Sequence, residues 1–433
     1  MKKVLVITYY WPPSGGAGVQ RWLKFVKYLR NYGWEPIIYT PENPEAPAVD
    51  YSLEKDIPEN LTVIKTKIWE PYSVYKKFIG QKQDEKVKAG FLTEKRKPSL
   101  AENFSIWIRG NFFIPDARKF WIKPSVKFLT NYLRENPVDA MATTGPPHSM
   151  HMIGLGVKKN LGIPWLADFR DPWTNIDFYD QLKLSKMANN KHHKLERFVL
   201  QNADSITVIS NRMAKNFERI IKRHYEVITN GFDEDDALLQ ANMEKDRKFS
   251  IVYIGSINNA RNPIPLWKTL KSIIKENSEF EKNLEIKLVG PVDFSVKEDI
   301  KTFGLDKFIT YINYIPHNKI ATLQKRSQIL LLLINNTPNA KMVVTGKLFE
   351  YIASGTPILC IGPEDGDAAD IINETKSGIV IEFDDIEKLK KSIIILYKKF
   401  KQNELNIDNG NISKYSRKNL TKELSKILND ITP

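Results

Sequence analysis

Residues 345–359 read TGKLFEYIASGTPIL, and this stretch decides the fold. Its apolar residues recur at helical spacing, and Gly355 follows where a helix ends in the left-handed conformation. Pro357 then starts an apolar run that is typical of a strand buried on both faces. Glu350 is the single carboxylate of this helix. It either forms an exposed ion pair with Lys347, one turn earlier, or binds a ligand.

The sequence around this stretch repeats the alternation of strand and helix. Strands of the second half are expected at residues 251–255, 286–290, 309–312, 329–334, 357–361 and 378–383, with helices between them and an amphipathic helix at 415–431. Strands that alternate with helices form a parallel sheet. This half is therefore expected to be a Rossmann-like domain.

The first half shows the same pattern. A strand at residues 4–9, a glycine-rich loop at 12–18, a helix at 19–29 and a strand at 36–40 form a βαβ unit. Further strands are expected near 61–66, 138–143, 165–170, 205–209 and 225–228, and helices at 124–136 and up to Asn202. The glycine spacing differs from the dinucleotide fingerprint, so the loop does not indicate an NAD site.

Length and composition favour two domains. The 433 residues are many for one core, and a hydrophobic fraction of 42% suits globular packing. We expect an α/β protein with two Rossmann-like parallel-sheet domains that face each other across a cleft. The first spans residues 1–235 and the second 245–414, with a polar linker from Asp233 to Arg247 and a helix at 415–433 that crosses back to the first domain.

No targeting or membrane-spanning signal is visible in the sequence. Cys360 is the only cysteine, which fits a reducing compartment. The apolar run at residues 4–7 is too short for a signal peptide, and those at 329–334 and 393–397 are too short to cross a bilayer. We expect a cytoplasmic protein that is soluble or peripheral on the inner face of the membrane.

The positive charge is distributed unevenly along the chain. The formal net charge is +14, and residues 76–128 alone hold 13 Lys or Arg against 5 Asp or Glu. Such an excess either serves solvation or suits phosphate, nucleic acid or membrane headgroups. Within an insertion at about 70–124, basic residues alternate with aromatics. These either pack on their own domain or touch an anionic, lipid-linked partner.

Three groups of polar residues in the sequence are candidate sites. His148 and His151 lack a third ligand at a suitable spacing, so no metal is expected there. The acidic run at residues 233–236 is interpreted as solvated charge of the linker. Asp168, Arg170 and Asp171 follow a buried strand, and they form either a structural salt-bridge cluster or a ligand site.

Taken together, four motifs resemble glycosyltransferase family 4, whose members have the two-domain GT-B architecture. The motifs cover nearly the whole chain and are Tyr9-Tyr10-Trp11-Pro12-Pro13 with Gly15-Gly16, then Asn230-Gly231-Phe232-Asp233, Tyr253-Ile254-Gly255-Ser256, and residues 347–357. The resemblance implies a retaining transfer of a sugar from a nucleotide-sugar donor, without a catalytic metal or other cofactor. Residues Ser14, Gly15 and Gly16 look like the acceptor-side loop of that family.

The resemblance also implies a donor site in the second domain. Glu350 is expected to accept from the ribose hydroxyls, and the base is expected to meet the backbone around Tyr314, Ile315 and Pro316. The expected diphosphate contacts are Ser256, Arg261 and Lys347, helped by the backbone amides at Thr345, Gly346 and the helix start. With no metal present, these donors must stabilise the charge that develops on the leaving diphosphate. Gly255 and Leu348 are also expected at the donor site.

The sequence departs from the family pattern at three places. Met342 stands where the family often has a first glutamate near the donor sugar. Ser256 and Asn262 replace two common basic residues, which leaves Arg261 alone in that loop. Arg170 stands about where a histidine is common, and since arginine cannot act as a base near neutral pH, Arg170 and Asp171 are expected to position sugar or phosphate.

These observations favour a hexosyltransferase that builds a surface polysaccharide or another glycan. Its expected partners are the nucleotide-sugar, a glycan or lipid-linked acceptor and an anionic membrane surface, and no nucleic acid. Two alternatives stay open. One is a GT-B protein that binds nucleotide-sugar or glycan with little or no transfer, and the other is a UDP-sugar epimerase of the same architecture.

Overall fold

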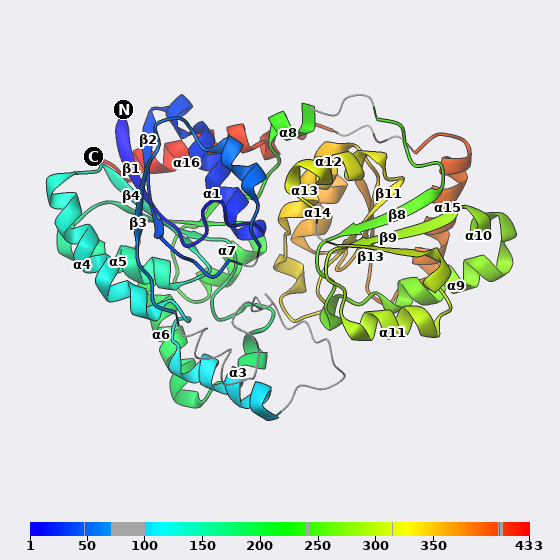
Figure 1. Ribbon diagram of the computed structural model, residues 1–433, viewed down its shortest axis with the longest axis horizontal. Coiled ribbons are helices and arrows are strands. Elements are labelled where there is room, and N and C mark those ends of the chain that lie inside the picture. The colour runs from blue at the N-terminus through cyan, green and yellow to red at the C-terminus, as the bar shows by residue number, and fades with distance from the viewer. Residues whose placement is uncertain (47, 71–99, 239–242, 314, 406, 408–409) are drawn as a thin grey trace. The chain divides into compact units, whose positions relative to one another are not determined.

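The computed structural model describes residues 1–46, 48–70, 100–238, 243–313, 315–405, 407 and 410–433. Its backbone forms two compact units (Figure 1). The first unit takes in the described residues up to Asn230 and adds Arg417–Pro433. The second unit is Gly231–Ser416. The end of the chain thus belongs to the unit in which the chain begins.

The first unit is built on a parallel sheet of seven strands in the order β3-β2-β1-β4-β5-β6-β7. The strand order reverses between β1 and β4, where neighbouring connections leave in opposite directions and open a crevice at the carboxyl ends. The strands are β1 (Lys2–Ile7), β2 (Trp34–Pro41), β3 (Thr62–Thr66), β4 (Ala140–Gly145), β5 (Trp165–Phe169), β6 (Ser205–Val208) and β7 (Glu226–Val227).

Helices cover both faces of this sheet. Those of the first unit are α1 (Ala17–Leu29), α3 (Leu100–Phe112), α4 (Lys119–Glu135), α5 (Ser149–Leu161), α6 (Lys186–Asn202), α7 (Asn211–Glu218) and α16 (Arg417–Asp430). On one face, Trp22 of α1 and Leu424 of α16 share a core with Val6 of β1. On the other face Gly154 of α5 lies against Thr143 and Trp165, too close to admit a side chain. The helices therefore pack tightly enough to fix the loops at the sheet edge.

The second unit has a parallel sheet of six strands in the order β10-β9-β8-β11-β12-β13. Here the order reverses between β8 and β11. The strands are β8 (Phe249–Ile254), β9 (Leu284–Val289), β10 (Ile309–Ile312), β11 (Ile329–Leu333), β12 (Ile358–Ile361) and β13 (Gly378–Ile381). Every residue of β8, β11 and β12 is buried, as the continuous apolar runs predict for central parallel strands.

The helices of the second unit include the stretch that decided the fold. They are α8 (Glu234–Leu238), α9 (Ile264–Glu276), α10 (Ser278–Asn283), α11 (Phe294–Thr302), α12 (His317–Arg326), α13 (Gly346–Ser354), α14 (Asp367–Glu374) and α15 (Ile386–Lys401). The helix α13 ends at Gly355, whose φ of 69° is left-handed, and β12 follows. The expected α/β fold with two parallel sheets is confirmed, and so is the expected helix–turn–strand at residues 345–359.

Some expected elements differ from the structure. The helix expected at 124–136 begins at Lys119, and Pro124 lies inside it, where it removes one backbone hydrogen bond. The expected solvated linker is also wrong in part. Asp233 is buried and accepts a hydrogen bond from the amide of Asp235, because it leads into the short helix α8. Of the expected insertion, residues 71–99 lie outside the described part of the chain.

Candidate functional site

In the second unit, polar side chains meet where the strand order reverses. Tyr253 lies near the end of β8, Asn335 follows β11, and Arg261 ends a short 3₁₀ helix at Asn259–Arg261. The Nε of Arg261 donates to Asn335 Oδ1 at 2.7 Å, and its Nη1 donates to the hydroxyl of Tyr253 at 3.4 Å. Lys347 completes the group from the first turn of α13. Strand β8, the segments that follow β8 and β11, and the start of α13 thus place two cations at the edge where open α/β sheets bind ligands.

The hydroxyl of Tyr253 is the centre of this group. It donates to the carbonyl oxygen of Ser256 at 3.0 Å and accepts from Lys347 Nζ at 3.1 Å. The Lys347 ammonium also lies 4.4 Å from the centre of the Tyr253 ring, which suits a cation–π contact. Burial alone raises the pKa of the Tyr253 phenol, but Lys347 and Arg261 outweigh burial and lower that pKa below its ordinary value.

Gly255 makes room for the lysine. Its φ is 128°, which side-chain-bearing residues rarely adopt, and a Cβ there would lie 2.5 Å from Lys347 Nζ. Burial, together with the charge of Arg261, lowers the pKa of the Lys347 amine. Glu350 acts in the opposite direction on that pKa, but no carboxylate within the described ranges forms an ion pair with Lys347 or Arg261. The two cations repel each other, so the group is prepared to bind an anion.

Glu350 does not form the exposed ion pair with Lys347 that was one alternative for it. Its carboxylate accepts from Gln324 Nε2 at 3.2 Å, and Lys347 donates to Tyr253. Gln324 comes from α12 and is almost fully buried, so it fixes one oxygen of Glu350. The half-buried carboxylate therefore has capacity left to accept hydrogen bonds from a ligand.

The other residues expected at the donor site divide into two groups. Gly346 has open space where a Cβ would stand, and the Thr345 hydroxyl is buried without a hydrogen-bond partner. Both lie at the start of α13, where backbone N–H groups favour an anion. Leu348 is instead fully buried in the core, and its amide donates to the carbonyl of Thr345. Ile315 packs against the same core. Tyr314 lies outside the described residues.

In the first unit, Arg170 joins the first turn of α1 to the loop that follows β4. Its Nη1 donates to the carbonyl of Gly18 at 2.9 Å, and its Nη2 donates to the carbonyl of Pro146. Its Nε is buried without a partner. Asp171 follows, half-buried, and burial raises its pKa to about 6 against the lowering effect of Arg170. The arginine thus shapes the loops, and the carboxylate titrates near neutral pH.

The glycine loop of the first unit is held by the chain at residues 48–50. The amide of Ser14 donates to Trp11 and that of Gly15 to Ala48, the latter at 2.8 Å. A Cβ at Gly15 would lie 3.2 Å from the Cβ of Asp50. Gly16 is exposed, with a φ of 97°. Within the loop, Gly16 is therefore the position where a ligand can approach the backbone.

The histidines beside this edge are part of an aromatic cluster. His148 stacks on Trp173, with ring centres 4.5 Å apart, and His151 stacks on Phe169 at 4.3 Å. Burial lowers the pKa of both imidazoles, that of His151 to about 3. Both rings are therefore neutral at physiological pH. Trp173 also donates from its indole to His192, which links this cluster to α6.

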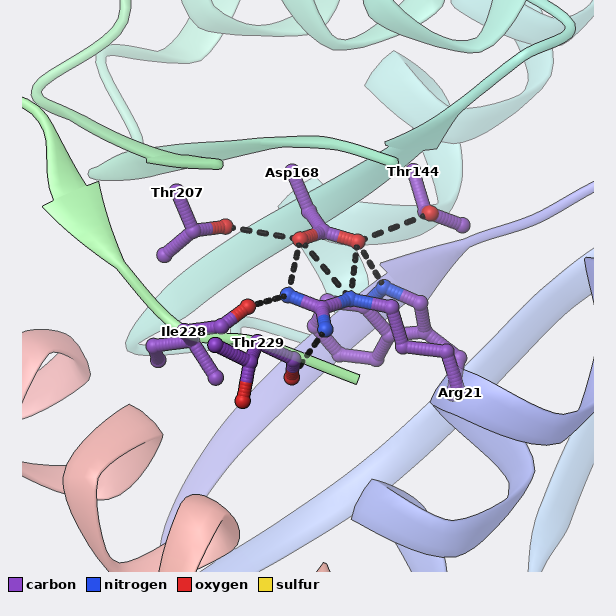
Figure 2. A network of polar contacts seen from close by, with 7 residues as sticks. Arg21, Thr144, Asp168, Thr207, Ile228 and Thr229 are labelled. Carbon is purple, nitrogen blue, oxygen red and sulfur yellow. Dashed lines mark hydrogen bonds and ion pairs between the residues drawn. The ribbon is translucent and has the colours of Figure 1, made fainter. Parts of the chain in front are cut away.

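Asp168 forms the structural salt bridge that was one of its two alternatives. Its carboxylate lies 2.8 Å from Arg21, and both side chains are 1% exposed. Figure 2 shows Thr144 and Thr207 donating to the same carboxylate from neighbouring strands. Arg21 also donates to the carbonyls of Ile228 and Thr229. The network therefore ties α1, three strands and the segment after β7 together, and both oxygens of Asp168 already accept hydrogen bonds from protein donors.

Sequence reasoning missed Gln324 and Asn335, and it did not recognise the side chain of Tyr253 as a site residue. Asn335 carried a usable signal, since it is a polar residue directly after a fully apolar strand at the reversal point. Gln324 carried none, because its contact with Glu350 depends on how α12 packs on α13.

Comparison with known proteins finds a family model that matches part of the chain and solved structures that are similar in fold to nearly all of it. Residues 234–417 match the family model of the glycosyl transferases group 1. No curated protein sequence matches the chain.

Three solved structures are similar over almost their full length. Sucrose-phosphate synthase from Thermosynechococcus elongatus has 13% identity and a TM-score of 0.59, covering 100% of this chain and 96% of that one. A glycosyltransferase from Rickettsia africae has 14% identity and a TM-score of 0.61, covering 99% and 98%. The Anabaena protein HepE, in complex with UDP-glucose, has 11% identity and a TM-score of 0.57, covering 100% and 97%. The chain therefore has the two-sheet GT-B fold of these structures, and its second unit is similar to group 1 glycosyl transferases.

Proposed function

We propose that this protein is a retaining glycosyltransferase that uses a nucleotide-sugar donor and no catalytic metal. The observation that carries the proposal is the pair of cations, Lys347 and Arg261, at the reversal point of the second sheet, where no carboxylate of the described residues forms an ion pair with either of them. Glu350 stands one helical turn beyond Lys347, at a distance along α13 that suits a ribose next to a diphosphate. The match of residues 234–417 to group 1 glycosyl transferases supports the same reading.

The chemistry assigned to the site follows from charge. When the bond between the anomeric carbon and the phosphate oxygen breaks, the leaving nucleoside diphosphate takes the electron pair, so negative charge grows on its oxygens. The N–H groups of Lys347 and Arg261 and the first amides of α13 are suited to stabilise this charge. Since they are held in place before the donor binds, they need little reorganisation during the reaction.

The acceptor is proposed to be a glycan or a lipid-linked sugar of a surface polysaccharide. Asp171 and the exposed backbone at Gly16 lie on the reversal edge of the first sheet, and Asp171 can accept from a sugar hydroxyl once it is ionised. Arg170 is proposed to stabilise the backbone at this edge through its hydrogen bonds to the carbonyls of Gly18 and Pro146.

Donor binding is tested by thermal unfolding in the presence of UDP-, GDP-, ADP- and dTDP-sugars, because a ligand of the native state raises its apparent stability. Nucleotide-sugars of one base are expected to raise the unfolding temperature. Glu350→Gln is expected to lower the affinity for that nucleotide-sugar about tenfold, because charged hydrogen bonds to the ribose are lost. Glu387→Gln, an exposed acid of α15, is the matched control. Absence of a shift with every donor contradicts the proposal.

A binding protein with reduced activity is the second candidate, and Met342 in place of the expected glutamate favours it. Slow release of nucleotide from the donor in the absence of acceptor distinguishes the two functions. An enzyme releases nucleotide and free sugar, whereas a binding protein leaves the donor intact. An epimerase instead converts the sugar while it stays attached to the nucleotide.

A membrane partner is proposed for the exposed side of α4, which we name the α4 face. It consists of Phe120, Lys123, Lys127, Phe128 and Arg134, which recur at helical spacing and are all exposed. Phe120 is 42% and Phe128 39% exposed. No acidic residue occurs between Lys119 and Arg134.

The contacts around the α4 face support an anionic bilayer surface as its partner. In the described parts of the chain, no carboxylate pairs with Lys123 or Lys127, which line a groove of about 410 Å³ between α4 and α5. The basic helix α15 differs, because several of its lysines form ion pairs, namely Lys388–Glu364, Lys390–Glu276 and Lys401–Glu279. Aromatic rings beside unpaired lysines suit the interface of an anionic membrane. No helix in the described ranges has the length and apolarity to cross a bilayer.

Flotation with vesicles tests this partner. The wild type is expected to float with phosphatidylglycerol vesicles, less so at high salt, and not with phosphatidylcholine vesicles. Lys123→Glu with Lys127→Glu is expected to abolish flotation. The same charge change in α15, Lys398→Glu with Lys399→Glu, is expected to preserve it. Equal losses in both double variants, or no flotation of the wild type, contradict the assignment.

A further inference from the structure

The phenol of Tyr253 is buried beside two cationic side chains, and its O–H donates to the carbonyl of Ser256. The side chain is fully buried, and its hydroxyl uses its full hydrogen-bonding capacity: it donates to Ser256 and accepts from Lys347 and Arg261. A buried tyrosine needs one partner for its hydroxyl. Three partners, two of them cations, exceed what packing alone requires.

A neutral acceptor has a specific advantage at this place. A carboxylate between Lys347 and Arg261 would fix their positions, but it would also cancel their charge toward a ligand. The phenol oxygen orients both cations and leaves their charge available. It occupies one N–H of the Lys347 ammonium, which has three, while the guanidinium of Arg261 is directed by Asn335, Ser256 and Tyr253. The remaining N–H groups can point to one anion.

We propose that Tyr253 is a positioning residue for the diphosphate of the donor, acting through Lys347 and Arg261. This inference rests on the proposed function. The hydroxyl holds the two cations close together, where they repel each other. A bound diphosphate carries the opposite charge and relieves that repulsion. Tyr253 thus determines affinity for the diphosphate and has no part in recognising the nucleoside.

Tyr253→Phe tests the inference, because it removes the hydroxyl and keeps the ring in the core. The wild type is first titrated calorimetrically with UDP, GDP, ADP and dTDP, and then with the nucleoside of the base that binds. Tyr253→Phe is expected to bind the nucleoside diphosphate about tenfold more weakly, with affinity for the nucleoside unchanged. Its effect is expected to disappear when Lys347→Met and Arg261→Met are already present, since it acts through them.

Tyr351→Phe is the matched control. Tyr351 is also fully buried in the second unit, and its hydroxyl accepts from the amide of Ile254 at 3.2 Å, whereas among the described residues it has no hydrogen bond to Lys347 or Arg261. This variant is expected to lose stability and keep diphosphate affinity. If Tyr253→Phe keeps diphosphate affinity as Tyr351→Phe does, the inference is wrong. If the wild type binds no nucleoside diphosphate, the proposed function itself is wrong.

A second variant keeps the inference testable if Tyr253→Phe does not fold. Replacing Tyr253 by 4-aminophenylalanine keeps the shape and the hydrogen bond donated to Ser256, but an aniline nitrogen is a poor acceptor for two cations. The expected result is a folded protein with the same tenfold loss for the diphosphate. Wild-type affinity in this variant contradicts the role of the hydroxyl as an acceptor.

Discussion

At the scale of single residues, Asp171 makes the proposed activity sensitive to pH. Burial raises its pKa to about 6, so the carboxyl is protonated below that pH and accepts hydrogen bonds above it. We expect kcat/KM to rise with pH through about 6. Asp171→Asn is expected to lower kcat/KM about tenfold and to remove this rise. The measurement is a pH–rate profile of donor turnover.

The control for this profile is Asp180→Asn, an exposed acid in the same loop region. It is expected to keep the rise near pH 6. A rise that survives in Asp171→Asn means that another group titrates, and the role of Asp171 is then withdrawn.

The types of residue at the donor edge could be predicted from the sequence, whereas the contacts between them could not. The glycine, lysine and glutamate of residues 346–350 could be assigned to one helix start because their spacing is local. The Lys347–Tyr253 contact joins residues 94 positions apart, and only the packing of α13 on the sheet creates it. Leu348 was expected at the donor site, and its side chain is buried in the core together with that of Phe349.

At the scale of elements, the pair of Arg21 and Asp168 fastens α1 to the sheet of the first unit. Burial alone raises the pKa of Asp168, but Arg21 and its other hydrogen-bond donors outweigh burial and lower it. Asp168→Asn leaves Arg21 buried without a counter-charge, so the free energy of unfolding is expected to fall by about 3–5 kcal/mol. Urea denaturation at neutral pH measures this loss.

The pH dependence gives the same prediction a second test. Because the carboxyl pKa is lower in the folded protein, the charged Asp168 increases the free energy of unfolding. This contribution is fully present at a pH above the ordinary carboxyl pKa of about 3.9, and it is lost as the pH falls below that value. The difference between wild type and Asp168→Asn should therefore shrink in acid. Glu35→Gln removes a partly exposed ion pair with Arg30 and is expected to cost roughly 1 kcal/mol or less. A comparable loss in both variants would contradict the special role of the buried pair.

Element types were predictable from the sequence, whereas some boundaries were not. Pro124 was expected to start a helix, because proline favours the first turn. Aromatic contacts of Trp121 with Tyr39, 5.0 Å between ring centres, instead anchor an earlier start at Lys119. Asp233 was expected in solvent because it opens an acidic run, yet a helix start requires an acceptor there. For α4 a contact with a distant residue decided the outcome, whereas for Asp233 it was a hydrogen bond from a residue two positions away.

At the scale of the whole molecule, stability should divide between the two units. Leu428 of α16 is fully buried against α1 in the first unit, and Leu359 of β12 is fully buried in the second. Each change to alanine is expected to cost roughly 2–5 kcal/mol. Scanning calorimetry should show Leu428→Ala lowering the transition of the first unit and Leu359→Ala that of the second. A single transition lowered equally by both variants would contradict this division.

The return of α16 to the first unit has a consequence for biosynthesis. The chain enters the second unit at Gly231 and leaves it at Ser416, where Phe232 and Tyr415 are joined by a backbone hydrogen bond of 3.1 Å. Domains usually fold in the order in which they are synthesised. Here the second unit can be complete while the first still lacks the helix that covers α1. A nascent chain therefore exposes the apolar face of α1 until α16 has been synthesised, so chaperones have access to that face throughout the synthesis of the second unit.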